Sequence, residues 1–266
     1  MSLKTELLQL WQFRGFVTGS VSREFQGRYR NSLFGAAWTI FNPLSMIAVY
    51  TLVFSQVMRA KLPGVDSTFA YSIFLMAGLI PWGLFAEIVS RGQNLFLENA
   101  NLIKKVSFPK ACLPAILLLS SLTNFVIVLG LFLVVALLLG MAPGWSLLGM
   151  APLILIEVVI AMSLALILGV FNVFFRDAGQ LTGIFLQFCF WLTPIIYAID
   201  IIPESYRGWF GLNPLAPLFA GFQTIFVQNT FPDWSSLLPT VVVALVLMLY
   251  AALVVKKHSD DMVDEL

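Results

Sequence analysis

The sequence predicts an all-α polytopic membrane protein with six transmembrane helices. Of its 266 residues, 59% are hydrophobic and only 11% are charged, whereas an ordinary soluble domain is about 45–50% apolar and about 25% charged. A chain with so few charges cannot cover a soluble surface of its own, which excludes a soluble single-domain enzyme. Its net charge of +1 provides no basic field that would attract nucleic acid.

Long apolar stretches locate the expected spans, because a helix needs about 20 apolar residues to cross a bilayer. We expect these spans at about residues 34–58, 69–90, 111–140, 147–175, 178–199 and 234–255. The run from Ala111 to Ile156 is too long for one crossing, and Ala142-Pro143-Gly144 divides it at a tight turn.

A further apolar segment, residues 208–232, is too polar to face lipid. Its polar and helix-breaking residues are Asn213, Pro214, Pro217, Gln223, Gln228 and Asn229. Such a segment is tolerated at membrane depth only where protein surrounds it. We therefore expect this segment to be a re-entrant element, buried in protein, between the fifth and sixth spans.

The Lys and Arg residues set the orientation of this topology. With six crossings and a cytoplasmic N-terminus, only Arg59, Lys61 and Arg207 fall outside, which leaves 12 of the 15 basic residues on the cytoplasmic side. That asymmetry is what the positive-inside rule requires. It places both termini in the cytoplasm, with a membrane domain over residues 33–256 and a cytoplasmic tail over residues 257–266.

Residues 1–32 are expected to form a cytoplasmic interfacial segment. Within it, Leu3, Leu7, Leu10, Trp11 and Val17 share one face of a helix. This pattern is typical of an amphipathic helix that lies in the membrane interface. A soluble helix packed against a partner is the alternative.

Two other segments leave a structural and a functional interpretation open. The loop of residues 91–110 mixes apolar and basic residues, which fits either positive-inside anchoring or docking of a cytoplasmic partner. Residues 191–234 contain 10 aromatic residues in 44. They fit either an interfacial aromatic belt or a ring-lined exit for a substrate with flat faces.

Charged side chains within the spans are few. Glu157 lies inside the fourth span, where it is either a structural acid or part of a proton relay. Glu87 and Arg91 are four residues apart and are expected to pair on one helical face.

Catalytic and metal-binding motifs are absent from the sequence. No glycine is followed by lysine, so there is no phosphate-binding loop, and no His-Glu-x-x-His or Gly-x-Ser-x-Gly motif occurs. Cys112, Cys189 and His258 form no metal-ligand spacing. We therefore expect no enzyme activity, metal or cofactor in this chain, so that uphill transport would need a partner or an ion gradient.

Several motifs in sequence order nevertheless resemble a known family. They are Arg28–Trp38 (RYRNSLFGAAW), Pro43-Leu44, Gly78–Trp82 (GLIPW), Asn101–Val106 (NLIKKV), Phe108-Pro109, Pro114, Phe174–Asp177 (FFRD), Trp191–Tyr197 (WLTPIIY) and Asn213-Pro214. Together they resemble the membrane (permease) subunit of ABC-2-type polysaccharide exporters, closest to the O-antigen lipopolysaccharide transporters. Phe34 departs from the leucine that is more usual before the glycine in this family.

The resemblance implies a homodimer in the bacterial inner membrane, with a channel along the dimer axis. Two copies of a cytoplasmic ABC ATPase subunit would bind ATP and Mg and drive export of a polyprenyl-diphosphate-linked polysaccharide. Residues 95–109 would be the coupling helix, with Glu98, Asn101, Leu102, Ile103, Lys104, Lys105 and Phe108 at the ATPase contact. Residues 200–232 would form short re-entrant periplasmic helices that gate the exit. The substrate would meet Arg28, Arg30, Trp38, Trp82, Trp191, Tyr197, Trp209 and Phe222.

Arg28 and Arg30 precede the first span at a depth where a diphosphate head group would lie. Arginine binds phosphate in a planar fork, although positive-inside anchoring explains the same two residues.

Other functions remain as alternatives. An exporter of the same architecture could carry capsule, teichoic acid, a drug or another lipid. A membrane-embedded glycan or lipid enzyme would need clustered acids or histidines, and a gradient-driven transporter would need internal repeats.

Overall fold

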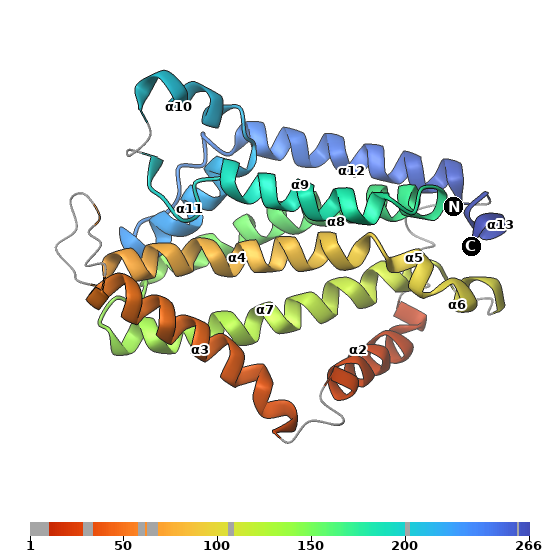
Figure 1. Ribbon diagram of the computed structural model, residues 1–266, viewed down its shortest axis with the longest axis horizontal. Helices are drawn as coiled ribbons and strands as arrows, with labels where there is room; N and C mark the ends of the chain where they lie inside the picture. The colour runs from red at the N-terminus through yellow and green to blue at the C-terminus, as the bar shows by residue number, and fades with distance from the viewer. Residues whose placement is uncertain are drawn as a thin grey trace.

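The computed structural model describes residues 11–28, 34–57, 62, 69–105, 109–199, 203–259 and 261–266. In this part of the chain the long elements are helices that run side by side in one bundle (Figure 1). The short helices α5, α6 and α13 lie at one end of the bundle, which we name the α6 end. Helices α10 and α11 lie toward the opposite end, which we name the α10 end.

The elements follow one another along the bundle with these bounds. The first half contains α2 (Arg14–Arg28), η1 (Gly35–Ala37), α3 (Trp38–Leu52), η2 (Val53–Val57), α4 (Ala70–Gly92), α5 (Leu95–Glu98), α6 (Ala100–Lys105) and α7 (Cys112–Leu138). The second half contains η3 (Trp145–Gly149), α8 (Met150–Phe174), α9 (Ala178–Leu192), α10 (Glu204–Gly211), α11 (Leu215–Val227), α12 (Leu238–His258) and α13 (Asp261–Glu265).

Five helical segments of the described chain are long and apolar enough to cross a membrane. They are Trp38–Val57, Ala70–Gly92, Cys112–Leu138, Trp145–Phe174 and Leu238–His258, and they coincide with five of the six predicted spans.

The remaining predicted span contains the shorter helix α9, which has 15 residues. At 1.5 Å per residue it is about 22 Å long, less than the hydrocarbon core of about 30 Å. It ends at Leu192 because Pro194 disfavours the helical conformation in the residue before it. Thr193 is accordingly extended, with φ −100° and ψ 131°.

Helix α4 lies at the centre of the bundle. Of its most apolar stretch 72% is buried, compared with 11% for α3 with η2 and 17% for α12. The core around it includes Phe85 and Ile88 of α4 together with Phe219 and Phe222 of α11, all fully enclosed. Helices α3 and α12 therefore present most of their apolar surface outward.

Glycines allow α4 to approach its neighbours closely at two levels. A Cβ placed on Gly92 would lie 2.3 Å from the Cβ of Ala165 in α8, and a Cβ on Gly169 would lie 2.8 Å from the Gly92 carbonyl oxygen. Nearer the α10 end, a Cβ on Gly78 would lie 3.0 Å from the Ile195 carbonyl oxygen. Small residues at such crossings are typical of helices packed in membranes, where van der Waals contact drives association.

The polar residues of the 208–232 segment bond within the protein. The Asn213 amide donates to the Leu192 carbonyl at 3.1 Å and to the Thr193 hydroxyl at 2.9 Å. The Gln223 amide donates to the carbonyls of Pro194 and Ile195 at 3.1 and 3.0 Å. These bonds satisfy side-chain amides whose exposure to lipid would cost free energy. The segment contains the end of α10 and all of α11.

The predicted turn after α7 is confirmed, since α7 ends at Leu138 and η3 begins at Trp145. Asn229 holds this turn against the end of α11. Its side-chain oxygen accepts bonds from the Gly144 amide at 2.7 Å and from the Ser146 hydroxyl at 2.8 Å. Asn229 itself adopts a left-handed conformation, with φ 53°, which asparagine tolerates better than most residues.

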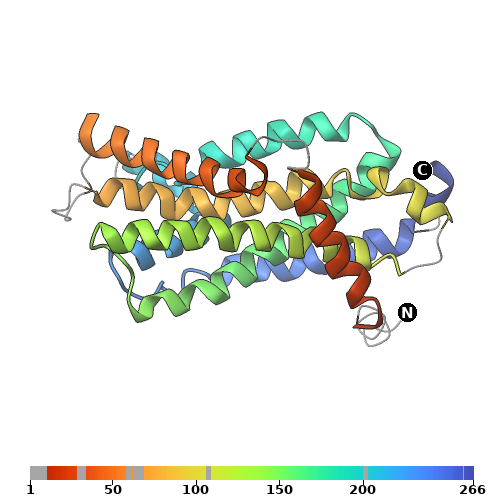
Figure 2. The ribbon, with the colours of Figure 1, turned by 90° about the horizontal axis from the view of Figure 1, so that it is seen from below.

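The expected N-terminal amphipathic helix falls mostly outside the described residues, including Leu3, Leu7 and Leu10. The following helix α2 lies across α7 (Figure 2). Val17 is buried, whereas Trp11 is 68% exposed, so the two do not share one contact face.

A polar junction and an adjoining cleft as the candidate functional site

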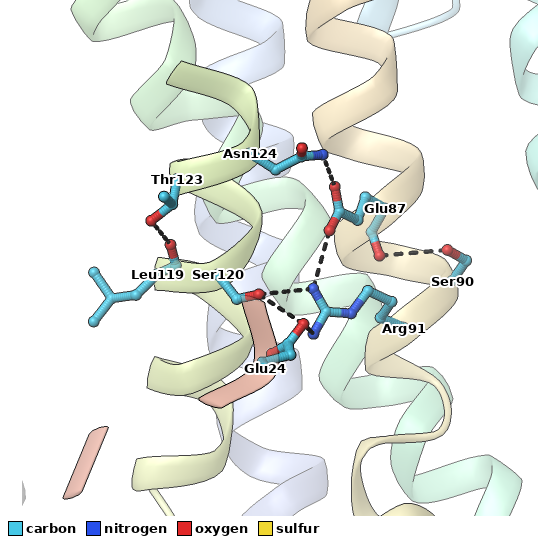
Figure 3. Close-up of polar contacts among 8 residues, drawn as sticks. All are labelled: Glu24, Glu87, Ser90, Arg91, Leu119, Ser120, Thr123 and Asn124. Carbon is cyan, nitrogen blue, oxygen red and sulfur yellow. Dashed lines mark hydrogen bonds and ion pairs between the residues drawn. The ribbon is translucent and has the colours of Figure 1, made fainter. Parts of the chain in front are cut away.

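Helices α2, α4 and α7 meet at a network of charged and polar side chains, which we name the polar junction. Its centre is Arg91, near the end of α4. The Arg91 guanidinium donates from Nη2 to Glu24 Oε1 of α2 at 2.6 Å and from Nη1 to Glu87 Oε1 at 3.0 Å (Figure 3). The pair of Glu87 and Arg91 expected from their spacing is thus confirmed.

Helix α7 completes the junction with two side chains one turn apart. The Ser120 hydroxyl donates to Glu24 Oε1 at 2.8 Å and accepts from Arg91 Nη1 at 3.1 Å. The Asn124 amide donates to Glu87 Oε2 at 2.8 Å (Figure 3). Both carboxylates are therefore held by hydrogen bonds from α7 as well as by the arginine.

Glu24, Ser120 and Asn124 were not among the site residues predicted from the sequence. Ser120 and Asn124 are four residues apart in α7, so they lie on one face of a helix whose other polar residues are Ser121 and Thr123. That spacing was an available signal for α7. No local pattern links Glu24 to Arg91, because 67 residues separate them.

A cleft of about 370 Å³ opens beside the junction, between α3, α4 and α7. Glu87 and Asn124 belong to both features. Trp38, Thr39 and Asn42, from the first turns of α3, line the cleft on its other side, and apolar side chains line the rest. Of the residues expected to contact substrate, Trp38 is therefore the one that the structure places at this cleft.

The other residues expected to contact substrate do not gather at one place. Trp82 is partly buried and packs against Phe85, Phe190 and Phe219, with ring centroids 5.3–5.9 Å apart. Phe222 is fully buried in the core. Trp191 is 56% exposed on α9, and Tyr197 follows it beyond the helix end. Arg30 and the side chains of Arg28 and Trp209 lie outside the described residues.

The expected coupling residues occupy α5 and α6 at the α6 end. Glu98 ends α5, and Asn101, Leu102, Ile103 and Lys104 belong to α6. Ile103 packs against Leu95, Leu113 and Leu117, while Asn101, Leu102 and Lys104 are exposed. Phe108 and the side chain of Lys105 lie outside the described residues.

Glu157 is fully enclosed in α8, and neither carboxyl oxygen has a hydrogen-bond partner within the described residues. A relay would need a second polar group to receive a proton. The structure therefore favours the structural interpretation of this acid.

Substituting Glu157 should consequently leave transport intact. We expect Glu157→Gln to retain full export and Glu157→Leu to stabilise the fold by about 1 kcal/mol, because it removes an unsatisfied buried polar group. Thermal unfolding in detergent, together with an export assay in cells, checks both. Loss of export in a well-folded Glu157→Gln protein would establish the relay instead.

Comparison with known proteins identifies the family. The family model described as ABC-2 type transporter matches residues 17–227. The chain belongs to the ABC-2 type transporter family. This result confirms the resemblance inferred from the sequence motifs.

Three relatives of this ABC-2 transporter chain have names that describe export or transport. The O-antigen export system permease protein RfbA of Myxococcus xanthus is 32% identical over 97% of the chain and 98% of its own length. A Klebsiella pneumoniae protein of the same name is 31% identical over 79% of both chains. The polysialic acid transport protein KpsM of Escherichia coli is 23% identical over 73% of this chain and 74% of its own.

Proposed function

We propose that this chain is the membrane subunit of an ATP-driven exporter that moves a polyprenyl-diphosphate-linked polysaccharide of the O-antigen type across the bacterial inner membrane. The observation that carries the proposal is the end-to-end similarity to an O-antigen export permease. The exporter of a capsule-like polysaccharide is the second candidate, favoured by the more distant similarity to KpsM.

The proposed topology has six crossings, with α9 as the fifth and the α6 end in the cytoplasm. Basic residues support this orientation, because those of the described chain gather at the α6 end: Arg14, Arg23, Arg91, Lys104, Lys110, Arg176, Lys256 and Lys257. Arg207 of α10 lies at the other end. In this arrangement α2 lies at the cytoplasmic interface, and α10 and α11 are the re-entrant helices of a periplasmic gate.

A homodimer would use the outward-facing helices α3 and α9. Their exposed side chains include Phe41, Val49, Phe185, Phe188 and Trp191. A second copy related by two-fold symmetry would place these faces around a shared channel, as self-complementary interfaces do.

The energy for export would come from two copies of a separate cytoplasmic ABC ATPase. The sequence has no phosphate-binding loop, so ATP and Mg would be bound by that partner. Helix α6 supports a docking role, because it packs its Ile103 side into the bundle and leaves Leu102 and Lys104 exposed. Movement of α6 would then be passed to the first and fifth crossings, α3 and α9, and open the central path.

Deletion of the gene tests this function in its native host. We expect lipid-linked glycan to accumulate in the inner leaflet and to disappear from the cell surface, with restoration by this chain. A cysteine at position 102 should crosslink to the ATPase, whereas one at exposed Trp145 of the α10 end should not. Normal surface glycan in the deletion strain would refute the proposal.

Replacing the two arginines before α3 tests the head-group contact. We expect Arg28→Ala and Arg30→Ala to reduce export about tenfold each, since each removes a charge-assisted bond to the diphosphate worth about 1.5–3 kcal/mol. Co-purification of the dimer with its ATPase should not change. Normal export by both variants would exclude these residues from the substrate site.

A further inference from the structure

The cleft between α3, α4 and α7 is lined by the side chains that a neutral sugar requires. We propose that it binds one sugar residue of the glycan, with the Trp38 indole as a stacking face and Asn42, Asn124 and Glu87 as hydrogen-bonding groups. This inference rests on the proposed function, in that the cargo is a glycan, and adds a site for it in the half of the bundle toward the α6 end.

The side-chain amide of Asn42 has no hydrogen-bond partner within the described residues. Asn42 is exposed on α3, lines the cleft and makes no hydrogen bond to any other described residue. It belongs to a helix that is long and apolar enough to span the membrane. Polar side chains at such positions are costly and mark substrate pathways, so a polar ligand beside Asn42 accounts for its presence.

The described lining of the cleft has no cation that would attract a phosphate group. No described Lys or Arg lines the cleft. The nearby Arg91 guanidinium is engaged with Glu24, Glu87 and Ser120. Among the described residues, a diphosphate therefore finds no free cation in this lining. Glu87 is held by Arg91 and by Asn124, so its carboxylate oxygens are fixed acceptors that suit the hydroxyl groups of an uncharged sugar.

The Trp38 indole gives the cleft an aromatic face. Trp38 is 36% exposed, and Phe34 contacts it edge to face with centroids 5.7 Å apart. This contact fixes the orientation of the indole, and a rigid aromatic face packs against the apolar face of a ring-shaped ligand. The volume of about 370 Å³ lies at the small end of ligand pockets, about 300–1,000 Å³, which suits one or two rings and not a polymer.

Binding of two matched probes to the permease with its ATPase in lipid nanodiscs tests the inference. One probe is a short-chain prenyl diphosphate that carries a single N-acetylhexosamine, which is uncharged, and the other is the same prenyl diphosphate without sugar. We expect Asn42→Leu and Trp38→Leu each to weaken binding of the sugar-bearing probe about fivefold, which corresponds to one hydrogen bond or ring contact of about 1 kcal/mol. Binding of the sugar-free probe should not change.

Two controls separate the cleft from general effects. Ser45→Leu changes a neighbouring exposed polar residue of α3 outside the cleft, and Trp145→Leu removes an exposed tryptophan at the α10 end. Neither should affect the sugar-bearing probe. Trp38→Phe should retain most of the affinity, because it keeps an aromatic face.

The remaining outcomes contradict the inference in distinguishable ways. Unchanged affinity of the sugar-bearing probe for Asn42→Leu and Trp38→Leu excludes a sugar at the cleft while the proposed function stands. Equal weakening of both probes assigns the cleft to the lipid or its diphosphate. A change of oligomeric state in Asn42→Leu, measured by light scattering, assigns it to a second copy of the chain. If neither probe binds the unsubstituted complex, the inference and the proposed glycan cargo both fail.

Discussion

Arg91→Ala is expected to release α2 from the bundle and to lower the stability of the permease by about 2 kcal/mol. Removing the arginine leaves the carboxylates of Glu24 and Glu87 without their shared cation. Breaking a fully buried ion pair costs about 3–5 kcal/mol, and the side chains here keep 18–30% exposure, which lessens the penalty. Thermal unfolding in detergent and the rate of proteolytic cleavage within α2 measure the two effects.

Further substitutions test whether the loss of charge pairing causes the lower stability of Arg91→Ala. Glu24→Gln in the Arg91→Ala background should recover part of the stability, because it removes one of the two carboxylate charges that share Arg91. Arg91→Lys should be intermediate, since an ammonium cannot reproduce the two-sided guanidinium geometry. Arg23→Ala is the matched control, because Arg23 is exposed on α2 and, within the described part of the chain, bonds only to Ser20 of the same helix. An Arg91→Ala protein with unchanged unfolding temperature and unchanged protection of α2 would show that the junction does not hold this helix.

Gly92→Val is expected to prevent correct packing of α4 against α8. Even the first carbon of a side chain at position 92 would lie 2.3 Å from the Ala165 Cβ, so the two backbones must separate. Overpacking of this kind costs about 1–3 kcal/mol and occasionally more, and valine adds two further methyl groups. We expect little monodisperse protein by size-exclusion chromatography.

A smaller substitution and its compensation test the same contact without depending on loss of the fold. Gly92→Ala should lower the unfolding temperature, and Ala165→Gly should restore part of it by removing the opposing Cβ. Gly130→Ala in α7 is the control. A Cβ there meets no atom within 4 Å, and alanine favours a helix by about 0.5–1 kcal/mol over glycine. Equal stability of Gly92→Ala and the unsubstituted protein would contradict the close approach.

Local patterns in the sequence predicted most of the helices but not how they meet. Five spans followed from apolar length alone, and the pair of Glu87 and Arg91 followed from helical spacing. The early end of α9 was also encoded locally, in Thr193-Pro194, but apolar length extended the predicted span beyond it. By contrast, the contact of Asn124 with Glu87 joins two helices that are distant in sequence, so neither residue indicates the other.

For the candidate site as well, the sequence predicted individual residues but not how the fold brings them together. Trp38 was predicted from its motif, whereas the cleft that it lines depends on how α3 leans on α4 and α7. Aromatic composition could not separate rings at a surface from rings in the core. Phe222, Trp82 and Trp191 are all aromatic, yet the fold encloses Phe222, partly buries Trp82 and leaves Trp191 exposed.

The two glycine contacts of α4 limit which parts of the molecule can move during a transport cycle. Gly92 meets α8 near one end of the helix, and Gly78 meets the Ile195 carbonyl toward the other. Rotation or sliding of α4 by even half a turn would bring larger side chains onto these neighbouring backbones, so α4 and α8 form a stationary scaffold. A passage for a polymer must therefore open by movement of the helices around α4 and α8. Foremost among them is α3, which with η2 has only 11% of its apolar stretch buried.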